Sequence, residues 1–209
     1  EKRGMEFYRQ LLDRVGAQPG VVSPSLSDGV LNAWFGGTTW GHEIEGYTPR
    51  PDEPMGINYE AVAPRYFQTM RIALAEGREF SDLDHAQSAP VAIVNETMAK
   101  RYWPGASPLG KRVRFTDQDI WREVVGIVGD VKHWGLDAPV NPELYVPYTQ
   151  FSAFALTWVL QTNGDPLALV PLVQRHVPEL DANLPLFQVR TLEDVAARSV
   201  ERRRWTMTM

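Results

Sequence analysis

Cysteine is absent from the 209-residue sequence, which excludes disulfide bonds, thiolate metal ligands and cysteine nucleophiles. No apolar run reaches the length of about 18–20 residues that a helix needs to span a bilayer, and no signal peptide is visible. The formal net charge is −5, and no basic stripe is visible in this acidic chain. We therefore expect no nucleic-acid partner. The lack of cysteine leaves the compartment open, because it fits the periplasm as well as a reducing cytosol.

What is present is the composition of a globular domain. Hydrophobic residues make up 44% of the chain and charged residues 22%, so we expect a packed core. The length suits one large domain or two small ones. Helix and strand patterns are mixed without strict alternation or a fixed-period repeat, which predicts an α+β fold.

Periodicity and turn residues locate the expected elements. Apolar residues at helical spacing predict helices at 7–16, 64–70, 96–103 and 166–177, and from 191 onward. Apolar or alternating runs predict strands at 21–22, 42–47, 91–94, 111–115, 122–131, 144–146, 154–162 and 185–189. We expect a loop at 23–41, a stiff proline-rich connection at 49–54 and a turn at 77–80.

Polar residues at three positions are expected to cap helices. Asn95 precedes the helix at 96–103, and Thr191 resembles the start of a capping box. Ser81 is expected to cap a short segment, with Asp82 and Asp84 solvated in its first turn. Pro171 lies inside the pattern at 166–177 and should kink that helix or delay its start.

The elements fall into three regions. Residues 1–56 and 151–209 each carry helix and strand pieces of similar size, whereas residues 57–150 hold most of the predicted strands. We expect the two end regions to pack together, with the middle region as an inserted second α+β part.

One segment matches a phosphate-binding loop without its context. Gly105 to Lys111 reads G-x-x-x-x-G-K, but Arg112 stands where Ser or Thr should hold magnesium. The segment also follows a predicted helix and opens a predicted strand, the reverse of a true phosphate loop. We interpret it as a tight helix-to-strand connection with Lys111 on a solvated face.

Other motifs for catalysis or metal binding are incomplete. Gly126 and Gly129 form half of a dinucleotide fingerprint inside a strand pattern, where a bulge or close packing explains them. Ser25 and Ser27 lie outside any G-x-S-x-G elbow. The four histidines, which lack partners at metal-ligand spacing, are His42, His85, His133 and His176. We therefore predict no catalytic residue, no cofactor or cofactor-binding residue and no metal ligand.

Seven tryptophans are many for this length. A sugar platform or a partner interface is one interpretation, and core packing is the default for most of them. They are Trp34, Trp40, Trp103, Trp121, Trp134, Trp158 and Trp205.

The two ends carry patterns of their own. The chain opens on a helical pattern at Glu1 and closes with Arg202–Arg204 followed by Trp205. A basic cluster followed by Trp is typical of the transition from a membrane interface into a membrane helix. A segment boundary in any multidomain protein is the alternative interpretation.

Six short motifs occur in order between Tyr66 and Tyr148. They are YFxTM at 66–70, GRxF at 77–80, VAIVNE at 91–96, PGxSPLGK at 104–111, VVGIVGDV at 124–131 and PExYVPY at 142–148. This ordered set resembles the periplasmic core domain of MacB-like ABC transporter permeases. The segment at 192–204 is similar to the lead-in to their second membrane helix.

The resemblance implies an architecture and a place in the cell. The domain would lie between the first and second membrane helices of a four-helix permease in the bacterial inner membrane, on its periplasmic or extracellular side. A porter-like part would be built from residues 1–56 and 151–209, around an inserted part at 57–150.

The resemblance also implies a mode of action, called mechanotransmission. ATP hydrolysis by a cytoplasmic ABC ATPase subunit or domain would move the periplasmic domains for export or efflux. A second permease copy and a periplasmic adaptor are further partners that it implies. Two alternatives stay open: an extracellular ligand-binding module of a membrane protein, and a soluble hydrolase that uses surface carboxylates.

Overall fold

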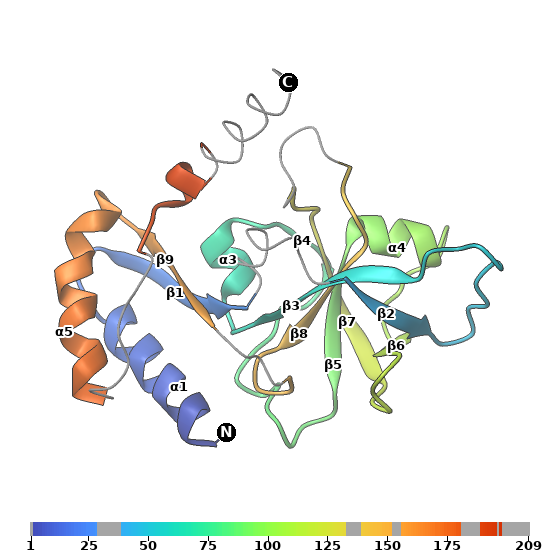
Figure 1. The fold of residues 1–209 in the computed structure, drawn as a ribbon, viewed down its shortest axis with the longest axis horizontal. Helices are drawn as coiled ribbons and strands as arrows, with labels where there is room; N and C mark the ends of the chain where they lie inside the picture. The colour runs from blue at the N-terminus through green and yellow to red at the C-terminus, as the bar shows by residue number, and fades with distance from the viewer. Residues whose placement is uncertain are drawn as a thin grey trace, which may run out of the picture. The chain divides into compact units, whose positions relative to one another are not determined.

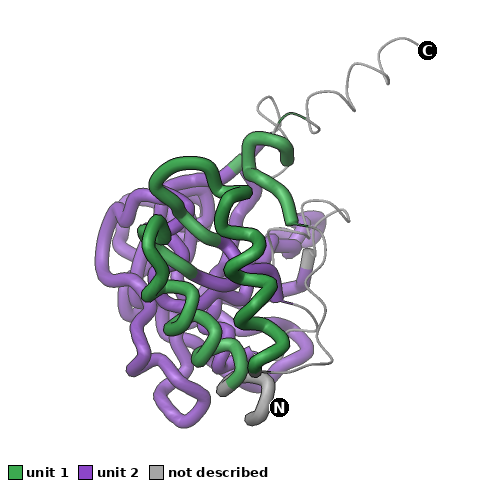
Figure 2. Tube along the Cα trace, turned by 90° about the vertical axis from the view of Figure 1, so that its left-hand side faces the viewer, with its two compact units in different colours: residues 1–24, 132–138, 160–209 green, residues 25–131, 139–159 purple. Residues whose placement is uncertain are grey.

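Helices and strands of both orientations build the chain, which confirms the α+β class. The computed structural model describes residues 2–28, 39–132, 139–151, 156–180, 189–195 and 197. Two compact units are present (Figure 2). Unit 1 comprises residues 1–24, 132–138 and 160–209, and unit 2 comprises residues 25–131 and 139–159. Two strands, β1 (Val21–Ser27) and β9 (Thr157–Thr162), have residues in both units.

Unit 1 is organised by two helices that pack together, α1 (Lys2–Gly16) and α5 (Val170–Leu180), as Figure 1 shows. Their apolar faces are buried, and Arg14 forms an ion pair of 3.1 Å with Glu179. The 3₁₀-helix η1 (Pro166–Leu169) precedes α5, with Asp165 accepting the Leu167 N–H at 2.9 Å. The α-helix therefore begins later than Pro166, which confirms the predicted delay.

Six strands of unit 2, within the described residues, pair in a closed ring. The strands are hydrogen-bonded to one another in the order β2-β6-β7-β5-β8-β3, and β3 also pairs with β2, which closes the ring. Some of these pairs are parallel and others antiparallel. The ring is a small barrel, in which inward and outward side chains alternate along each strand. Its strands are β2 (Thr39–Ile44), β3 (Gly56–Val62), β5 (Val91–Asn95), β6 (Arg112–Phe115), β7 (Arg122–Val128) and β8 (Glu143–Pro147).

The pairing register identifies the inner face of the barrel. His42 lies opposite Phe115, and Ile44 lies opposite Val113. The inward side chains are aliphatic over most of the barrel and almost fully buried. This inner layer includes Ile44, Ile57, Val113, Val124 and Leu144.

A second apolar layer covers the outer face of β3, β5 and β8. The short helix α3 (Tyr66–Met70) contributes Tyr66 and Phe67, which pack with Tyr145 in one buried cluster. The Phe67 and Tyr145 rings meet edge to face at 4.9 Å between centroids, a favourable aromatic geometry. The barrel is therefore packed on its inside and on part of its outside.

Helix α4 (Glu96–Tyr102) begins where β5 ends. The Asn95 side chain accepts the Met98 N–H at 2.9 Å, as its predicted role as N-cap requires. Tyr102 at the far end of the helix meets the His42 ring edge to face at 5.1 Å. The sequence predicted this strand, cap and helix within one residue of their bounds.

The sequence analysis missed four strand segments. The predicted loop at 23–41 contains the second half of β1 and the first residues of β2. Strand β3 was not predicted, and β4 (Leu74–Gly77), which pairs with β7, was expected in part as a turn. The predicted strand at 185–189 falls mostly outside the described residues.

The compact units differ in their bounds from the predicted division at residues 56/57 and 150/151. Residues 39–56 join unit 2 because β2 pairs with β3 and β6. The assignment of a porter-like part and an inserted part stays a prediction.

Gly126 offers a test of how tightly β4 and β7 approach. A Cβ atom there would lie 2.3 Å from the Arg78 carbonyl oxygen. We expect Gly126→Ala to lower the free energy of unfolding by roughly 2–3 kcal/mol, because the backbone has to shift. Urea unfolding measures this.

Gly129 is the matched control. Its added Cβ would meet the Ala73 carbonyl oxygen at 3.7 Å, an ordinary contact. Gly129→Ala should change the free energy of unfolding by less than about 1 kcal/mol. Equal losses in the two variants would contradict the close approach at Gly126.

Candidate functional site

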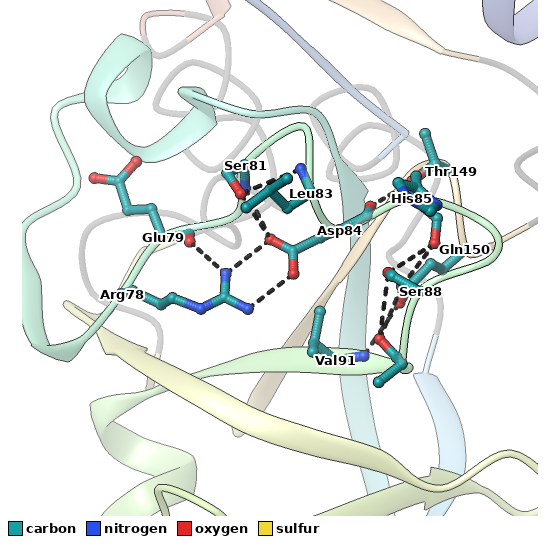
Figure 3. A network of polar contacts seen from close by, with 11 residues as sticks. Arg78, Glu79, Ser81, Leu83, Asp84, His85, Ser88, Val91, Thr149 and Gln150 are labelled. Atoms are coloured by element: carbon teal, nitrogen blue, oxygen red, sulfur yellow. Dashed lines mark hydrogen bonds and ion pairs between the residues drawn. The ribbon is translucent and has the colours of Figure 1, made fainter.

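An ion pair anchors the loop that follows β4 (Figure 3). The Arg78 guanidinium donates two hydrogen bonds of 2.8 Å to the two oxygens of Asp84. The Ser81 N–H donates to the same carboxylate at 2.9 Å. The Asp84 side chain is only 5% exposed, whereas that of Arg78 is 49% exposed. Burial raises the pKa of Asp84, but the Arg78 and Ser81 hydrogen bonds outweigh it and the pKa is lowered.

The far half of the same loop is tied to the residues after β8. Gln150 donates to the His85 carbonyl at 3.1 Å and to the Ser88 hydroxyl at 2.9 Å. The Gln150 side-chain oxygen accepts the Val91 N–H at 3.1 Å, and Thr149 donates to the Asp84 carbonyl at 2.8 Å. Figure 3 shows these two groups of contacts on either side of Asp84.

The anchored loop is well defined without being a helix. The structure places turns at 81–88, so the predicted helical start with Asp84 in solvent is wrong. Asp84 is buried because Arg78, six residues earlier, supplies its counter-charge. The loop presents Leu83 to solvent with 79% of its surface exposed. A polar network of this kind can hold a surface loop in one shape.

Two buried carboxylates lie on the outer face of the barrel. Glu60 on β3 accepts hydrogen bonds from the Tyr66 hydroxyl at 2.7 Å and from the Ser27 hydroxyl. Glu143 on β8 accepts from the Tyr145 hydroxyl at 2.8 Å. Burial, and then the nearby carboxylates, raise the pKa of both tyrosines well above the usual value. Both tyrosines are therefore neutral donors, suited to structure rather than to proton transfer near neutral pH.

Two further buried groups have shifted pKa values of opposite sense. Burial raises the pKa of Asp28 to about 6, against the hydrogen bonds from backbone N–H groups of Ala61 and Asp28 itself. Burial lowers the pKa of His42 to about 4. His42 is 1% exposed, and its Nδ1 lies 3.2 Å from the Met55 carbonyl oxygen. At neutral pH both groups are therefore in their ordinary charge states, but each titrates within reach of mild acid.

The phosphate-loop lookalike has the context that was predicted, since it connects α4 to β6. Two of its backbone donors bond to carbonyl groups of the chain itself. The Gly110 N–H bonds to the Val124 carbonyl at 2.9 Å, and the Lys111 N–H bonds to the Pro108 carbonyl at 3.0 Å. Lys111 is exposed, as expected.

The glycines and histidines that the sequence analysis singled out do not come together in one site within the described residues. Gly126 lies in β7 beside a register shift of β5 and against Arg78, which confirms the interpretation by a bulge and close packing. His85 is exposed, His176 lies 3.1 Å from Glu179, and His133 is outside the described residues. Among the described residues, no group of three or more metal-ligating side chains comes together.

Four aromatic rings gather at one end of the barrel, which we call the aromatic end (Trp40, Tyr59, Phe115 and Phe151). All six ring pairs have centroids 5.1–5.9 Å apart. Phe115 is buried, and the other three rings are partly exposed. The default of core packing therefore describes Trp40 only in part. Sequence spacing gave no signal for this cluster, because its members come from four separate segments.

Comparison with known proteins identifies the fold and the family. Residues 7–191 match the family described as the MacB-like periplasmic core domain. The chain belongs to this family. The periplasmic region of MacB from Actinobacillus actinomycetemcomitans shares the fold, with a TM-score of 0.63 at 17% identity over 92% of this chain and 82% of that one. The extracellular domain of YknZ, a noncanonic ABC-type transporter from Gram-positive bacteria, has a TM-score of 0.57 at 18% identity, over 87% of this chain and 88% of that one.

Two curated relatives of this MacB-like domain are export proteins. A probable syringafactin export ATP-binding/permease protein, SyfD of Pseudomonas syringae pv. tomato, is 34% identical over 115 residues, which are 50% of this chain and 17% of that protein. The macrolide export ATP-binding/permease protein MacB of Mannheimia succiniciproducens is 26% identical over 92 residues, 44% of this chain and 14% of that protein. The chain thus spans a small part of the relatives it matches. Within the described residues of this domain, no helix is long and apolar enough to cross a membrane.

The Arg78–Asp84 pair supports a stability prediction. Asp84→Ala removes a buried partner and leaves Arg78 partly hydrated, so we expect the free energy of unfolding to fall by about 2 kcal/mol. Amide hydrogen exchange should speed up across residues 81–90. Asp82→Ala is the control, since Asp82 is exposed in the same loop, and should change stability by less than about 0.5 kcal/mol. Unchanged exchange in Asp84→Ala would count against the anchoring role.

The shifted pKa of Asp28 supports a prediction of pH dependence. Its folded value of about 6 exceeds the ordinary 3.8, so the folded state binds this proton more tightly. The free energy of unfolding should therefore fall as the pH rises from about 4 to about 6, by on the order of 2–3 kcal/mol from this group.

Asp28→Asn should remove that component and leave the opposite one of His42, whose stabilising effect is lost as the pH falls from 6.5 to about 4. Urea unfolding at several pH values should thus show a steeper loss of stability on acidification than in the parent chain. Parallel pH profiles for the two proteins would rule out the shift at Asp28.

Proposed function

We propose that this domain is the extracytoplasmic part of an export permease and transmits conformational change driven by ATP, without catalysing a reaction itself. The match over residues 7–191 to the MacB-like periplasmic core domain supports this most directly. The curated relatives are named as ATP-binding/permease proteins for export, and this chain matches only 14–17% of their length. The remainder of such a protein would supply the membrane helices and the ATPase.

The proposed architecture follows the family likeness. Unit 1 would correspond to the porter-like part, which the chain ends build together through α1 and α5. Unit 2, with its closed ring of strands, would correspond to the inserted part. Membrane helices would flank the domain on both sides, in the inner membrane of a bacterium. A cytoplasmic ATPase, a second permease copy and a periplasmic adaptor are the proposed partners.

The geometry of the described residues agrees with a mechanical role. Two buried carboxylates, Asp84 and Glu60, accept hydrogen bonds from donors within the chain. Satisfied buried networks stiffen a fold and favour one conformation. A stiff body can pass on a movement that is applied at its ends.

A ligand-binding module of a membrane protein is the second candidate. One observation favours it, namely the three partly exposed rings of the aromatic end. Barrel ends that combine apolar rings with a few polar groups are common binding sites.

A crosslinking experiment in the full permease tests the mechanical proposal. The domain has no cysteine of its own, so an introduced pair has no competitor within it. A panel would combine Asp13→Cys on α1 with single cysteines at exposed positions of unit 2, and the pairs that oxidise completely would be kept. We expect the crosslink to abolish most export while ATP binding persists, and a reductant to restore export.

A pair within unit 2, Glu43→Cys with Arg114→Cys, is the matched control. These residues lie opposite each other on β2 and β6, and their crosslink should leave export unchanged. Full export with a completely formed bridge between the units would contradict relative motion of the two parts.

A further inference from the structure

Arg122 is a buried cation without a matching anion. It is 1% exposed, and its guanidinium donates to the Gln118 side-chain oxygen at 2.8 Å and to the Ile120 carbonyl at 3.2 Å. Within the described residues its Nε–H has no acceptor, and no carboxylate lies within ion-pair distance. Asp117, which is exposed, is the charged group that acts on it. Burial without a counter-charge is costly for a guanidinium.

The register places Arg122 on the inner face of the barrel. It lies opposite Val113 of β6, and Val113 shares its inward direction with Phe115, two residues along. The Arg122 guanidinium carbon is 5.1 Å from the centre of the Phe115 ring. Phe115 is also in contact with the other three rings of the aromatic end. Phe115 therefore contacts both the buried cation and the three partly exposed rings.

The Arg122 guanidinium and the rings of the aromatic end can together bind a molecule with an anionic group and an apolar body. A guanidinium has five N–H donors and binds a carboxylate through two of them at once. The oxygens that Arg122 now bonds are neutral, and a carboxylate would add an opposite charge and bidentate geometry to such bonds. Its two neutral acceptors lie in the β6–β7 turn, where Ile120 is 44% exposed. A carboxylate entering beside this turn could join or replace them.

We propose that the aromatic end of the barrel binds an amphipathic carboxylate. The apolar body of the ligand lies against Trp40, Tyr59 and Phe151, and its carboxylate pairs with Arg122. This site lies wholly within unit 2 and does not depend on the proposed role in export.

The test compares an acid with the matched alcohol, using the ¹⁵N-labelled chain. The two probes are 4-phenylbutyrate and 4-phenylbutanol, which share one apolar body and differ in charge. NMR titrations follow the Arg122 Nε–H and the Trp40 indole N–H. We expect saturable shifts of both signals with the acid, and binding of the alcohol that is about tenfold weaker.

Three substitutions separate the two halves of the site. Arg122→Gln should bind acid and alcohol equally. Trp40→Leu should weaken both probes, followed at Arg122, while their ratio persists. Trp121→Leu is the control, because that ring stacks with Arg112 and Arg114, at 5.7 and 4.9 Å, outside the site, and it should bind as the parent does. Circular dichroism checks that each variant is folded.

Several outcomes would overturn the proposal. They are shifts that do not saturate, shifts centred away from Arg122 and Trp40, equal affinity of the parent chain for acid and alcohol, and equal weakening by Trp40→Leu and Trp121→Leu. The first three need only the parent chain, so the proposal can be refuted even if Arg122→Gln does not fold.

Discussion

The pairing of β2 with both β3 and β6 is the constraint on which unit 2 depends. Without it, the other strands would form an open sheet with two unpaired edges, which are prone to pair with other chains. Backbone pairing joins β2 to β6, and two ion pairs bridge the same strands, where Glu43 accepts from Arg114 and Glu45 from Arg112. Closure gives each strand an inside and an outside, and this decides which side chains are buried. The aromatic end and the outer apolar layer both follow from it.

Buried polar groups add to the order that closure of the barrel imposes on unit 2. Glu60 and Asp84 are buried on separate parts of unit 2, and each is held by donors from a neighbouring segment. The cost of burying a carboxylate is thus offset by specific hydrogen bonds, which also fix how each segment packs. Arg122 differs, because its acceptors are neutral. The two carboxylates are thus bonded by donors that fix the fold, whereas the Arg122 guanidinium can still bond an anion.

Elements whose signal is contiguous in the sequence were predictable, whereas features that depend on contacts between distant residues were not. The strand at 91–94, the Asn95 cap and the following helix were predicted because the signal for each is contiguous in sequence. The start of strand β1 was predicted, but residues 23–27 were missed because the buried serines look like loop residues, although Ser25 donates to the Pro64 carbonyl at 3.1 Å. Asp84 appeared solvated because its partner Arg78 is recognisable only in three dimensions. The family likeness was recognised from six motifs in a fixed order. The aromatic end could not be predicted in that way, because no single motif contains all four of its rings.

The parallel pairs in the ring affect how the chain can fold. Strand β3 at residues 56–62 is bonded to β8 at residues 143–147, so the ring stays open until the later segment is available. Contacts between such distant segments slow folding, because a long loop must close before they stabilise anything. During synthesis the early strands would have unpaired edges until β8 is made, and these edges would be exposed to aggregation and proteolysis. Chaperones that cover these edges would therefore be expected to matter more for this domain than for a helical one of equal size.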